Sequence, residues 1–190
     1  MYICYMPKKR ISRTFILNQA LTIFSEKSYY NATMSEIAEA CGILKGSMYH
    51  YFPSKEALMK AVIKHVHTYF NEEIFTHAYN DHLTTEEKLR TMGILTEKML
   101  IDSEQGHIMG NIGIETARLI PEFSELIKDF FNDWITALTT VFSAKYAGDR
   151  AKEVAEQCVA EIEGAVMMVR IYNEPRFLHD TFKRILKRIR

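Results

Sequence analysis

Residues 33–52, TMSEIAEACGILKGSMYHYF, carry the pattern of two short helices joined by a turn. Thr33 and Glu36 form a Thr-x-x-Glu capping box, the pairing that satisfies free backbone N–H groups where a helix begins. Gly42 ends this helix, because glycine readily adopts the left-handed conformation that follows many helices. A second helix is expected over residues 45–52, after a turn of about four residues. This layout is that of a helix-turn-helix.

The helix expected over residues 45–52 has one side for the core and one side for solvent. Successive residues turn by about 100°, so Met48 and Phe52 point the same way and His50 points almost opposite. The outward face holds His50 at its centre together with Lys45, Gly46, Ser47, Tyr49 and Tyr51. In a major-groove helix, basic and aromatic edges reach phosphates while small and imidazole side chains reach base edges. The pattern therefore predicts binding of double-stranded DNA.

Most of the remaining chain also has a helical pattern. Apolar residues recur at intervals of three and four, and the 190 residues include only 8 Gly and 4 Pro. The expected helices cover residues 10–27, 33–41, 45–52, 54–76, 85–102, 111–119, 122–146, 149–172 and 175–190. We therefore expect an all-α protein. A three-helix helix-turn-helix domain over residues 1–53 is joined by a long helix to a helical ligand-binding and dimerisation domain over residues 54–190.

Charge is distributed unevenly, although the chain carries 24 basic and 24 acidic residues. Residues 1–65 contain nine Lys and Arg against four Asp and Glu, which leaves 15 against 20 in residues 66–190. The basic front domain, residues 1–65 in this count, suits contact with a polyanion. The acidic remainder, residues 66–190, suits a different role.

Composition also disfavours several classes of protein. Cys4, Cys41 and Cys158 have no C-x-x-C spacing, which argues against a zinc knuckle or a disulfide framework and favours a reducing compartment. No run approaches the ~18 apolar residues of a membrane span, and the opening six residues are too short for a signal peptide. We expect a cytoplasmic protein with no membrane contact, no metal and no cofactor.

Two other functions compete with DNA binding. An enzyme is disfavoured because the sequence has no H-E-x-x-H, glycine-rich phosphate loop or nucleophile elbow, so no catalytic residues are expected. The other rival is a helical ligand-binding or interaction protein without DNA binding. Leu44 supports this rival slightly, because leucine cannot cap the helix that follows it. A salt-dependent DNA-binding assay separates the two.

The residues from Arg13 to Leu58 resemble the TetR-type transcriptional regulators. The shared pattern is Ile16-Leu17-x-x-Ala20-x-x-x-Phe24, Tyr29, Thr33-Met34, Ile37-Ala38-x-x-Cys41-Gly42-Ile43, Lys45-Gly46-Ser47-Met48-Tyr49-His50-Tyr51-Phe52 and Ser54-Lys55-Glu56-x-Leu58. Two positions depart from the family: Ser28 replaces a usual glycine, and Leu44 replaces a usual capping serine. Met6 also resembles the family's usual start more closely than Met1 does.

The resemblance implies roles for the residues of the front domain. Phosphate contacts are expected from Thr33, Tyr49 and Lys55, with Tyr51 at the edge of the contact. The bases are expected to be read by Lys45, Gly46, Ser47 and His50. Residues 8–10 resemble the family's basic arm, and a charged terminus without contacts explains them equally well. The implied function is a repressor released from a palindromic operator by a small hydrophobic or aromatic ligand, with activation left open.

The ligand is expected between the helices of residues 85–119 and an apolar face that includes Phe130 and Trp134. The candidate ligand-binding residues are His107, Asn111, Glu115, Phe130, Trp134, Glu161 and Met168. Much of this apolar face also serves as ordinary core.

The carboxylates of the back domain each have an alternative explanation. Glu115 can pair with Arg118 three residues later, and Glu161 can lie near water or have an internal partner. Glu163 shares a helix face with Glu156 and Arg170, so we expect it in solvent.

A homodimer is predicted from the two long helices over residues 122–146 and 149–172. Both are apolar on more than one side, and Gly164-Ala165 permits close helix approach. A dimer would present two recognition helices to a two-fold site. The segments at residues 110–112 and 163–170 resemble the LmrA/YxaF-like branch of TetR regulators, which is linked to multidrug export.

Overall fold

The computed structural model describes residues 11–102, 108–116 and 119–190, and every regular element in them is a helix. The expected all-α class is therefore confirmed. The elements are α1 (Arg13–Asn31), α2 (Met34–Ala40), α3 (Lys45–Tyr51), α4 (Lys55–Glu73), the 3₁₀ helix η1 (Phe75–Tyr79), α5 (Thr85–Asp102), α6 (Ile108–Thr116), α7 (Pro121–Phe142), α8 (Asp149–Tyr172) and α9 (Arg176–Lys187).

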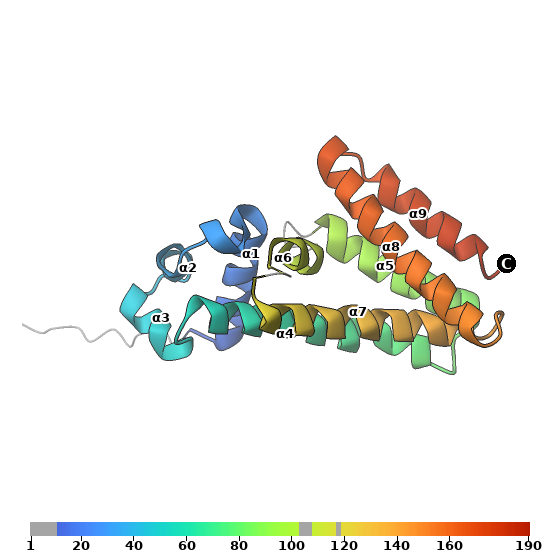
Figure 1. Ribbon diagram of the computed structural model, residues 1–190, viewed down its shortest axis with the longest axis horizontal. Helices are drawn as coiled ribbons and strands as arrows, with labels where there is room; N and C mark the ends of the chain where they lie inside the picture. The colour runs from blue at the N-terminus through green and yellow to red at the C-terminus, as the bar shows by residue number, and fades with distance from the viewer. Residues whose placement is uncertain (1–10, 103–107, 117–118) are drawn as a thin grey trace, which may run out of the picture.

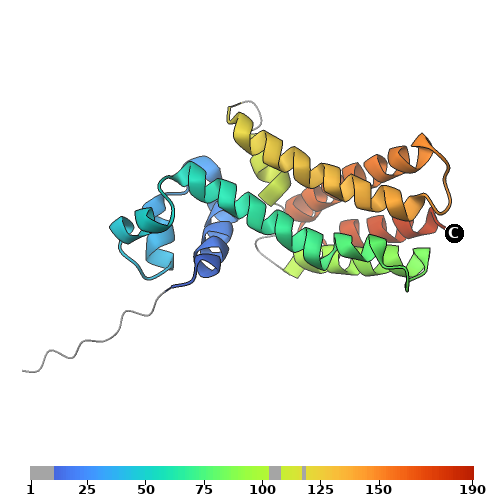
Figure 2. The ribbon, with the colours of Figure 1, turned by 90° about the horizontal axis from the view of Figure 1, so that it is seen from below.

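The molecule is elongated, with α1, α2 and α3 gathered at one end (Figure 1). α4 leaves this end and runs along α7 into the body, where α5, α8 and α9 pack together (Figure 2). α6 lies between α1 and the rest of the body and contacts both α1 and α7. Because α4 packs on α1 as well as on α7, the domain division after residue 53 stays a prediction.

The boundaries of α6 differ from the expected helix over residues 111–119. α6 begins at Ile108 and ends at Thr116. The difference arises because Ile108 and Met109 are buried and extend the apolar stripe of Ile112 by one turn toward the N-terminus.

The front end is organised around the apolar stripe expected on α1. Its buried members are Ile16, Leu17, Ala20, Leu21 and Phe24. They share one core with Ile37 of α2, Met48 of α3 and Leu58 of α4, each at most 1% exposed. The Arg13 guanidinium lies 4.2 Å from the centre of the Phe52 ring and donates to the Tyr51 carbonyl oxygen at 3.2 Å. Both contacts attach α1 to the end of α3.

The body is organised around α7, whose inward stripe is buried as expected. The buried residues include Phe123, Ile127, Phe130, Trp134, Leu138 and Val141. The Phe130 ring packs against the rings of Phe70 and Trp134 at centroid separations of 5.0 and 5.9 Å. Aromatic side chains from α4 and α7 therefore form the centre of the body. No helix in the described ranges is long and apolar enough to cross a membrane.

Ser28 interrupts α1 with a backbone conformation that serine rarely adopts. Its φ is +67° and its ψ is 168°, in a region occupied almost only by glycine. The chain turns there, and the Ala32 N–H donates to the Ser28 carbonyl oxygen at 3.2 Å. The departure from the family's glycine therefore coincides with backbone strain.

Ser28→Gly is expected to raise the free energy of unfolding by about 1 kcal/mol, because glycine adopts a positive φ without a Cβ clash. Urea denaturation followed by circular dichroism measures the change. Ser35→Gly is the matched control, because Ser35 is an exposed serine within α2 and its loss should lower stability instead. An unchanged or lowered stability in Ser28→Gly would contradict the strain.

Candidate functional site

The recognition helix α3 has the two faces expected from its sequence. Met48 is fully buried, whereas Tyr49 is 43% exposed and Lys45, Gly46 and His50 are exposed. Ser47 and Tyr51 are partly buried at the edges of the outward face. α3 thus presents Lys45, His50 and Tyr49 to solvent, while buried Met48 anchors the helix in the core. Leu44 precedes it without a side-chain cap and is 75% exposed, in agreement with the expected loss of capping.

Thr33 begins α2 with the expected capping box. The Thr33 hydroxyl accepts from the Glu36 N–H at 3.2 Å, and the Glu36 carboxylate accepts from the Thr33 N–H at 2.9 Å. Lys27 completes the cluster with an ion pair to Glu36 at 2.7 Å. These hydrogen bonds, with Lys27 the largest contributor, lower the pKa of Glu36 to about 2. The capping box therefore fixes the start of α2 and holds Thr33 at the surface.

Tyr51 connects the end of α3 to the start of the described chain. Its hydroxyl donates to the Ile11 carbonyl oxygen at 3.3 Å, and its own carbonyl accepts from Arg13. These contacts give Tyr51 a positioning role at the edge of the exposed face. Residues 8–10, the expected basic arm, lie outside the described residues.

Lys55 lies behind α3 and is bound to the end of α1. Its Nζ donates to the carbonyl oxygens of Tyr29 at 2.9 Å and Ala32 at 3.0 Å, and it lies 3.4 Å from the Tyr30 carbonyl oxygen. The same ammonium sits 4.6 Å from the centre of the Tyr29 ring. All three donors of the ammonium are thus directed at carbonyls that α1 leaves without helical partners. This geometry favours a positioning role for Lys55 over the direct phosphate contact expected from the sequence.

Glu115 binds the same corner from the opposite side. Its two carboxylate oxygens accept from the backbone N–H groups of Tyr29 and Tyr30, each at 2.9 Å. The sequence suggested a ligand contact or a pair with Arg118, which lies outside the described residues. The structure instead gives Glu115 a link between α6 and the end of α1. Residues 28–32, held by Lys55 and Glu115, are called the α1 corner below.

A cavity lies inside the body between α4, α5, α6, α7 and α8. Its free volume is about 20 Å³, and the lining residues are Val66, Phe70, Met99, Leu100, Ile108, Met109, Phe130, Trp134 and Glu163. The structure therefore brings together Phe130 and Trp134 of the expected ligand set. Asn111 is partly buried on α6 outside this lining, and His107 lies outside the described residues.

Glu163 is the cavity residue that sequence reasoning placed in solvent. It is partly buried, and burial raises the pKa of its carboxyl from 4.5 to about 7. The available signal was its spacing, because Val159 and Val166 lie four before and three after Glu163 and are both buried. Glu163 also shares a helix face with the charged residues Glu156 and Arg170, and this second pattern led to the expectation of solvent exposure.

Glu161 and Met168 do not line this cavity, which is named the aromatic cavity because Phe70, Phe130 and Trp134 line it. Glu161 and Met168 instead line a groove of about 360 Å³ between α8 and α9. The Glu161 carboxylate forms an ion pair with Arg188, whose guanidinium also donates to Cys158 Sγ at 3.0 Å. Glu161 thus has an internal partner, which is one of the readings that the sequence left open beside a ligand contact and a position near water.

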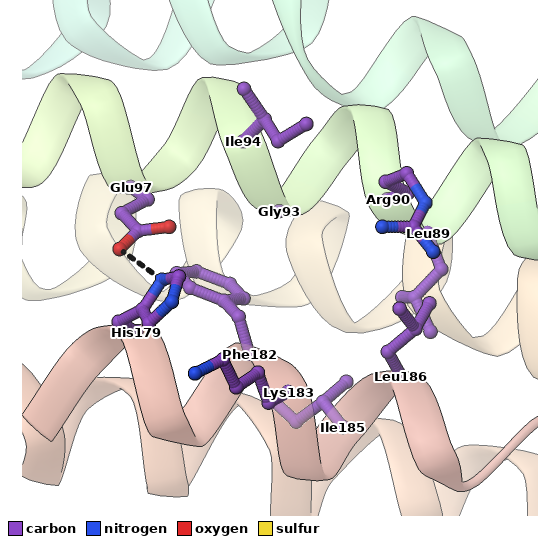
Figure 3. A pocket seen from close by; sticks show the side chains of 10 residues that line it. All are labelled: Leu89, Arg90, Gly93, Ile94, Glu97, His179, Phe182, Lys183, Ile185 and Leu186. Atoms are coloured by element: carbon purple, nitrogen blue, oxygen red, sulfur yellow. Dashed lines mark ion pairs between the residues drawn. The ribbon is translucent and has the colours of Figure 1, made fainter. Parts of the chain in front are cut away.

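A further pocket of about 130 Å³ lies at the surface between α5 and α9 (Figure 3). Gly93 permits the close approach of the two helices, because a Cβ there would lie 3.2 Å from the Phe182 ring. The charged residues of its rim are already paired, as Glu97 with His179, Arg90 with Glu86 and Lys183 with Asp180. This pocket is therefore a weaker candidate for a charged ligand than the aromatic cavity.

The fold and the exposed face of α3 define a helix-turn-helix protein with a separate helical body. Residues 16–62 match the family model described as "Bacterial regulatory proteins, tetR family". Residues 94–184 match the model described as "Transcriptional regulator LmrA/YxaF-like, C-terminal domain". The chain belongs to the TetR family of bacterial regulatory proteins.

Individual relatives agree with this assignment. The Escherichia coli regulator UidR is 50% identical over 52 residues, which are 27% of this chain and only 26% of UidR. The regulator AcuR of Cereibacter sphaeroides is 25% identical over 182 residues, covering 92% of this chain and 83% of AcuR. A TetR regulator structure from Legionella pneumophila aligns with a TM-score of 0.83 at 24% identity, covering 93% of this chain and 97% of that one.

Glu115→Gln is expected to lower the free energy of unfolding by about 1–3 kcal/mol, because one of the two carboxylate oxygens that accept at the α1 corner becomes an NH2 group, which cannot accept a hydrogen bond. Hydrogen exchange at the Tyr29 and Tyr30 amides should also become faster. Urea denaturation and exchange mass spectrometry measure the two effects. Glu125→Gln, at an exposed position of α7, is the control and should change neither. Unchanged exchange in Glu115→Gln would show that the carboxylate does not hold the corner.

Glu163→Gln is expected to stabilise the protein at pH 8 and to have little effect at pH 5. The folded chain holds the Glu163 proton more tightly than the unfolded chain, so wild type loses stability as pH rises from 4.5 to about 7. Glutamine does not titrate, so it avoids a loss of about 1–3 kcal/mol. Thermal denaturation at both pH values measures the difference, with exposed Glu156→Gln as control. Equal melting temperatures of Glu163→Gln and wild type at pH 8 would contradict the burial cost.

Proposed function

We propose that the protein is a transcriptional repressor that leaves a palindromic operator when a small hydrophobic or aromatic ligand enters the cavity beside Trp134. The observation that carries this proposal is α3, where Lys45, Gly46, Tyr49 and His50 are exposed on a helix anchored by fully buried Met48. Membership in the TetR family supports DNA as the partner of this face.

The residues in and around α3 have different roles in DNA binding. Thr33 and Tyr49 hold phosphates, since both are exposed at the margins of the helix-turn-helix. Base edges are read by Lys45, Gly46, Ser47 and His50, of which Lys45, Gly46 and His50 are exposed and Ser47 is partly buried at the edge of the outward face. Lys55 and Tyr51 act indirectly, because their polar groups are bound to backbone carbonyls of the front domain.

A second copy of the chain completes the DNA-binding unit. In one copy, α8 leaves Met167, Ile171 and Tyr172 more than half exposed. The groove between α8 and α9 lies on the same part of the body. A homodimer that buries this region would present two α3 helices to the two halves of a palindrome. This arrangement supports the two-fold operator.

The coupling between ligand and DNA runs through α6. Ile108 and Met109 at one end of α6 line the aromatic cavity, and Glu115 near its other end holds the α1 corner. The cavity has room for about one water molecule, so a ligand must move its walls. A shift of α6 would carry Glu115 and reorient the α1 corner, on which the front domain is mounted. The two α3 helices of the dimer would then no longer have the spacing that the two halves of the operator require, and the protein would leave the DNA.

A helical ligand-binding or interaction protein without DNA binding is the alternative function. Exposed and uncapped Leu44 is the observation that favours it. The two functions differ in salt dependence, because neutralised phosphates release counterions and make DNA affinity fall steeply with added salt.

His50→Ala is expected to cost about 1–3 kcal/mol on a preferred operator and much less on random DNA, because the proposed role of His50 is to contact base edges. The operator is obtained by selecting bound sequences from random duplexes. Fluorescence anisotropy at several salt concentrations then measures specific and non-specific affinity for wild type and variant.

His82→Ala is the control, since His82 is also exposed but lies after η1 at the far end of the body. It should leave both affinities unchanged. Equal weakening of specific and random DNA by His50→Ala would assign His50 to phosphates and overturn the base-reading face. Absence of salt-dependent DNA binding in wild type would favour the alternative function.

A further inference from the structure

We infer that Leu44 reads one thymine in each half of the operator, through contact between its apolar side chain and the C5-methyl group in the major groove. This inference rests on the proposed placement of α3 in that groove, and it adds one base to an operator whose sequence the proposed function leaves open. The leucine that favours the alternative function thereby becomes a specificity-determining residue of the DNA-binding face.

The start of α3 differs from the starts of the other helices at the front end. α1, α2 and α4 are preceded by Ser12, Thr33 and Ser54, and each of these side chains accepts a hydrogen bond from a backbone N–H of the helix that follows. Leu44 holds the same position before α3, and its side chain forms no capping hydrogen bond with the described residues. Leucine is therefore unfavourable here for the helix, because a hydroxyl or carboxylate side chain would stabilise it.

Leu44 does not serve the core of the front end either. It is 75% exposed, whereas its neighbour Ile43 packs against the core. The Leu44 carbonyl oxygen accepts from the N–H groups of Ser47 and Met48 at 2.9 and 3.2 Å, so the backbone of Leu44 is held while its side chain lies in solvent. Covering such a side chain with another apolar group is favourable. Contact with a partner molecule therefore explains a leucine that neither capping nor packing explains.

Gly46, two residues later, also has no role in the packing of the fold. A Cβ at Gly46 would meet no described atom within 4 Å, and its φ is not positive, so neither packing nor backbone conformation requires glycine. Glycine also weakens a helix relative to alanine. Without a side chain at Gly46, another molecule can approach the first turn of α3 closely. Exposed Lys45 and His50 belong to the same surface, which makes DNA the molecule that reaches Leu44.

The chemistry of the major groove selects thymine as the base that Leu44 contacts. The residues at the N-terminal end of a recognition helix are those that contact base edges. Thymine alone presents a methyl group in the major groove, beside the hydrogen-bond donors and acceptors that all base pairs present there. Leucine cannot pair with those polar groups or with a phosphate, and covering them would remove their water without replacing its hydrogen bonds.

Deoxyuridine is the probe for this contact, because it pairs as thymidine does and lacks only the methyl group. An operator is selected from random duplexes with the full wild-type chain, and its thymidines are then replaced by deoxyuridine one position at a time. Fluorescence anisotropy measures the affinity of wild type, Leu44→Ser and Ile94→Ser for each duplex. Ile94→Ser is the matched control, because Ile94 is an exposed aliphatic residue of α5 in the body.

Wild type should bind about fourfold more weakly when deoxyuridine replaces the contacted thymidine in one half-site, as expected for the loss of one buried methyl group. Replacement in both half-sites should weaken binding about fifteenfold, because distant contacts add. Leu44→Ser should bind the thymidine and deoxyuridine operators equally, while Ile94→Ser keeps the wild-type difference. This difference should not change with salt, because a methyl contact releases no counterions.

Leu44→Ser is expected to fold at least as stably as wild type, because serine can cap α3, and thermal denaturation checks this. Equal wild-type affinity for thymidine and deoxyuridine at every position, or a deoxyuridine effect that persists in Leu44→Ser, would overturn the inference. Equal weakening of operator and random DNA by Leu44→Ser would assign Leu44 to the DNA backbone and overturn it as well.

The same measurements distinguish this inference from the proposed function. Specific operator binding without any deoxyuridine effect overturns the role of Leu44 and leaves the DNA-binding function standing. If wild type selects no operator, the proposed function is overturned together with the inference, and the alternative function is favoured.

Discussion

The α1 corner is the point on which the rest of the structure depends. Its carbonyl oxygens accept from Lys55 of α4, and its N–H groups donate to Glu115 of α6. The Tyr29 ring lies 4.6 Å from the Lys55 ammonium and edge-on to Phe123 of α7 at 5.2 Å. Three helices, α4, α6 and α7, therefore contact this one turn of backbone. Its carbonyl oxygens are bound by the Lys55 ammonium, and its N–H groups are bound by the Glu115 carboxylate. These contacts attach the end of α1 to α4, α6 and α7.

This arrangement separates two tasks that the sequence places side by side. Lys45, Gly46, Tyr49 and His50 on the outward face of α3 are exposed, while Tyr51 and Lys55 next to them hold backbone groups. On the other side of the corner, α6 contributes both to the corner and to the aromatic cavity. The strained backbone of Ser28 lies within the same turn. Strain and charge are thus concentrated where the front domain meets the body.

The sequence alone was sufficient for the parts of the molecule that local pattern controls. The capping box of Thr33, the break at Gly42, and the opposite placement of Met48 and His50 depend on residues within one or two helical turns. The all-α class and the buried stripe of α7 follow from apolar spacing of the same kind. The first turn of α6 was missed, because its start depends on burial of Ile108 and Met109 against other helices.

Tertiary structure alone decided the partners of the charged side chains. Lys55 and Glu115 are 60 residues apart along the chain, and no local sequence pattern near either residue predicts that both bind the α1 corner. Glu161 and Glu163 lie two residues apart on α8, yet one pairs with Arg188 and the other lines the cavity. A helix that packs on several sides has no single polar face, so periodicity cannot assign its carboxylates. The sequence determined which surfaces exist, and the packing of distant helices determined what each charge does, because a charge takes its role from the partner that folding places beside it.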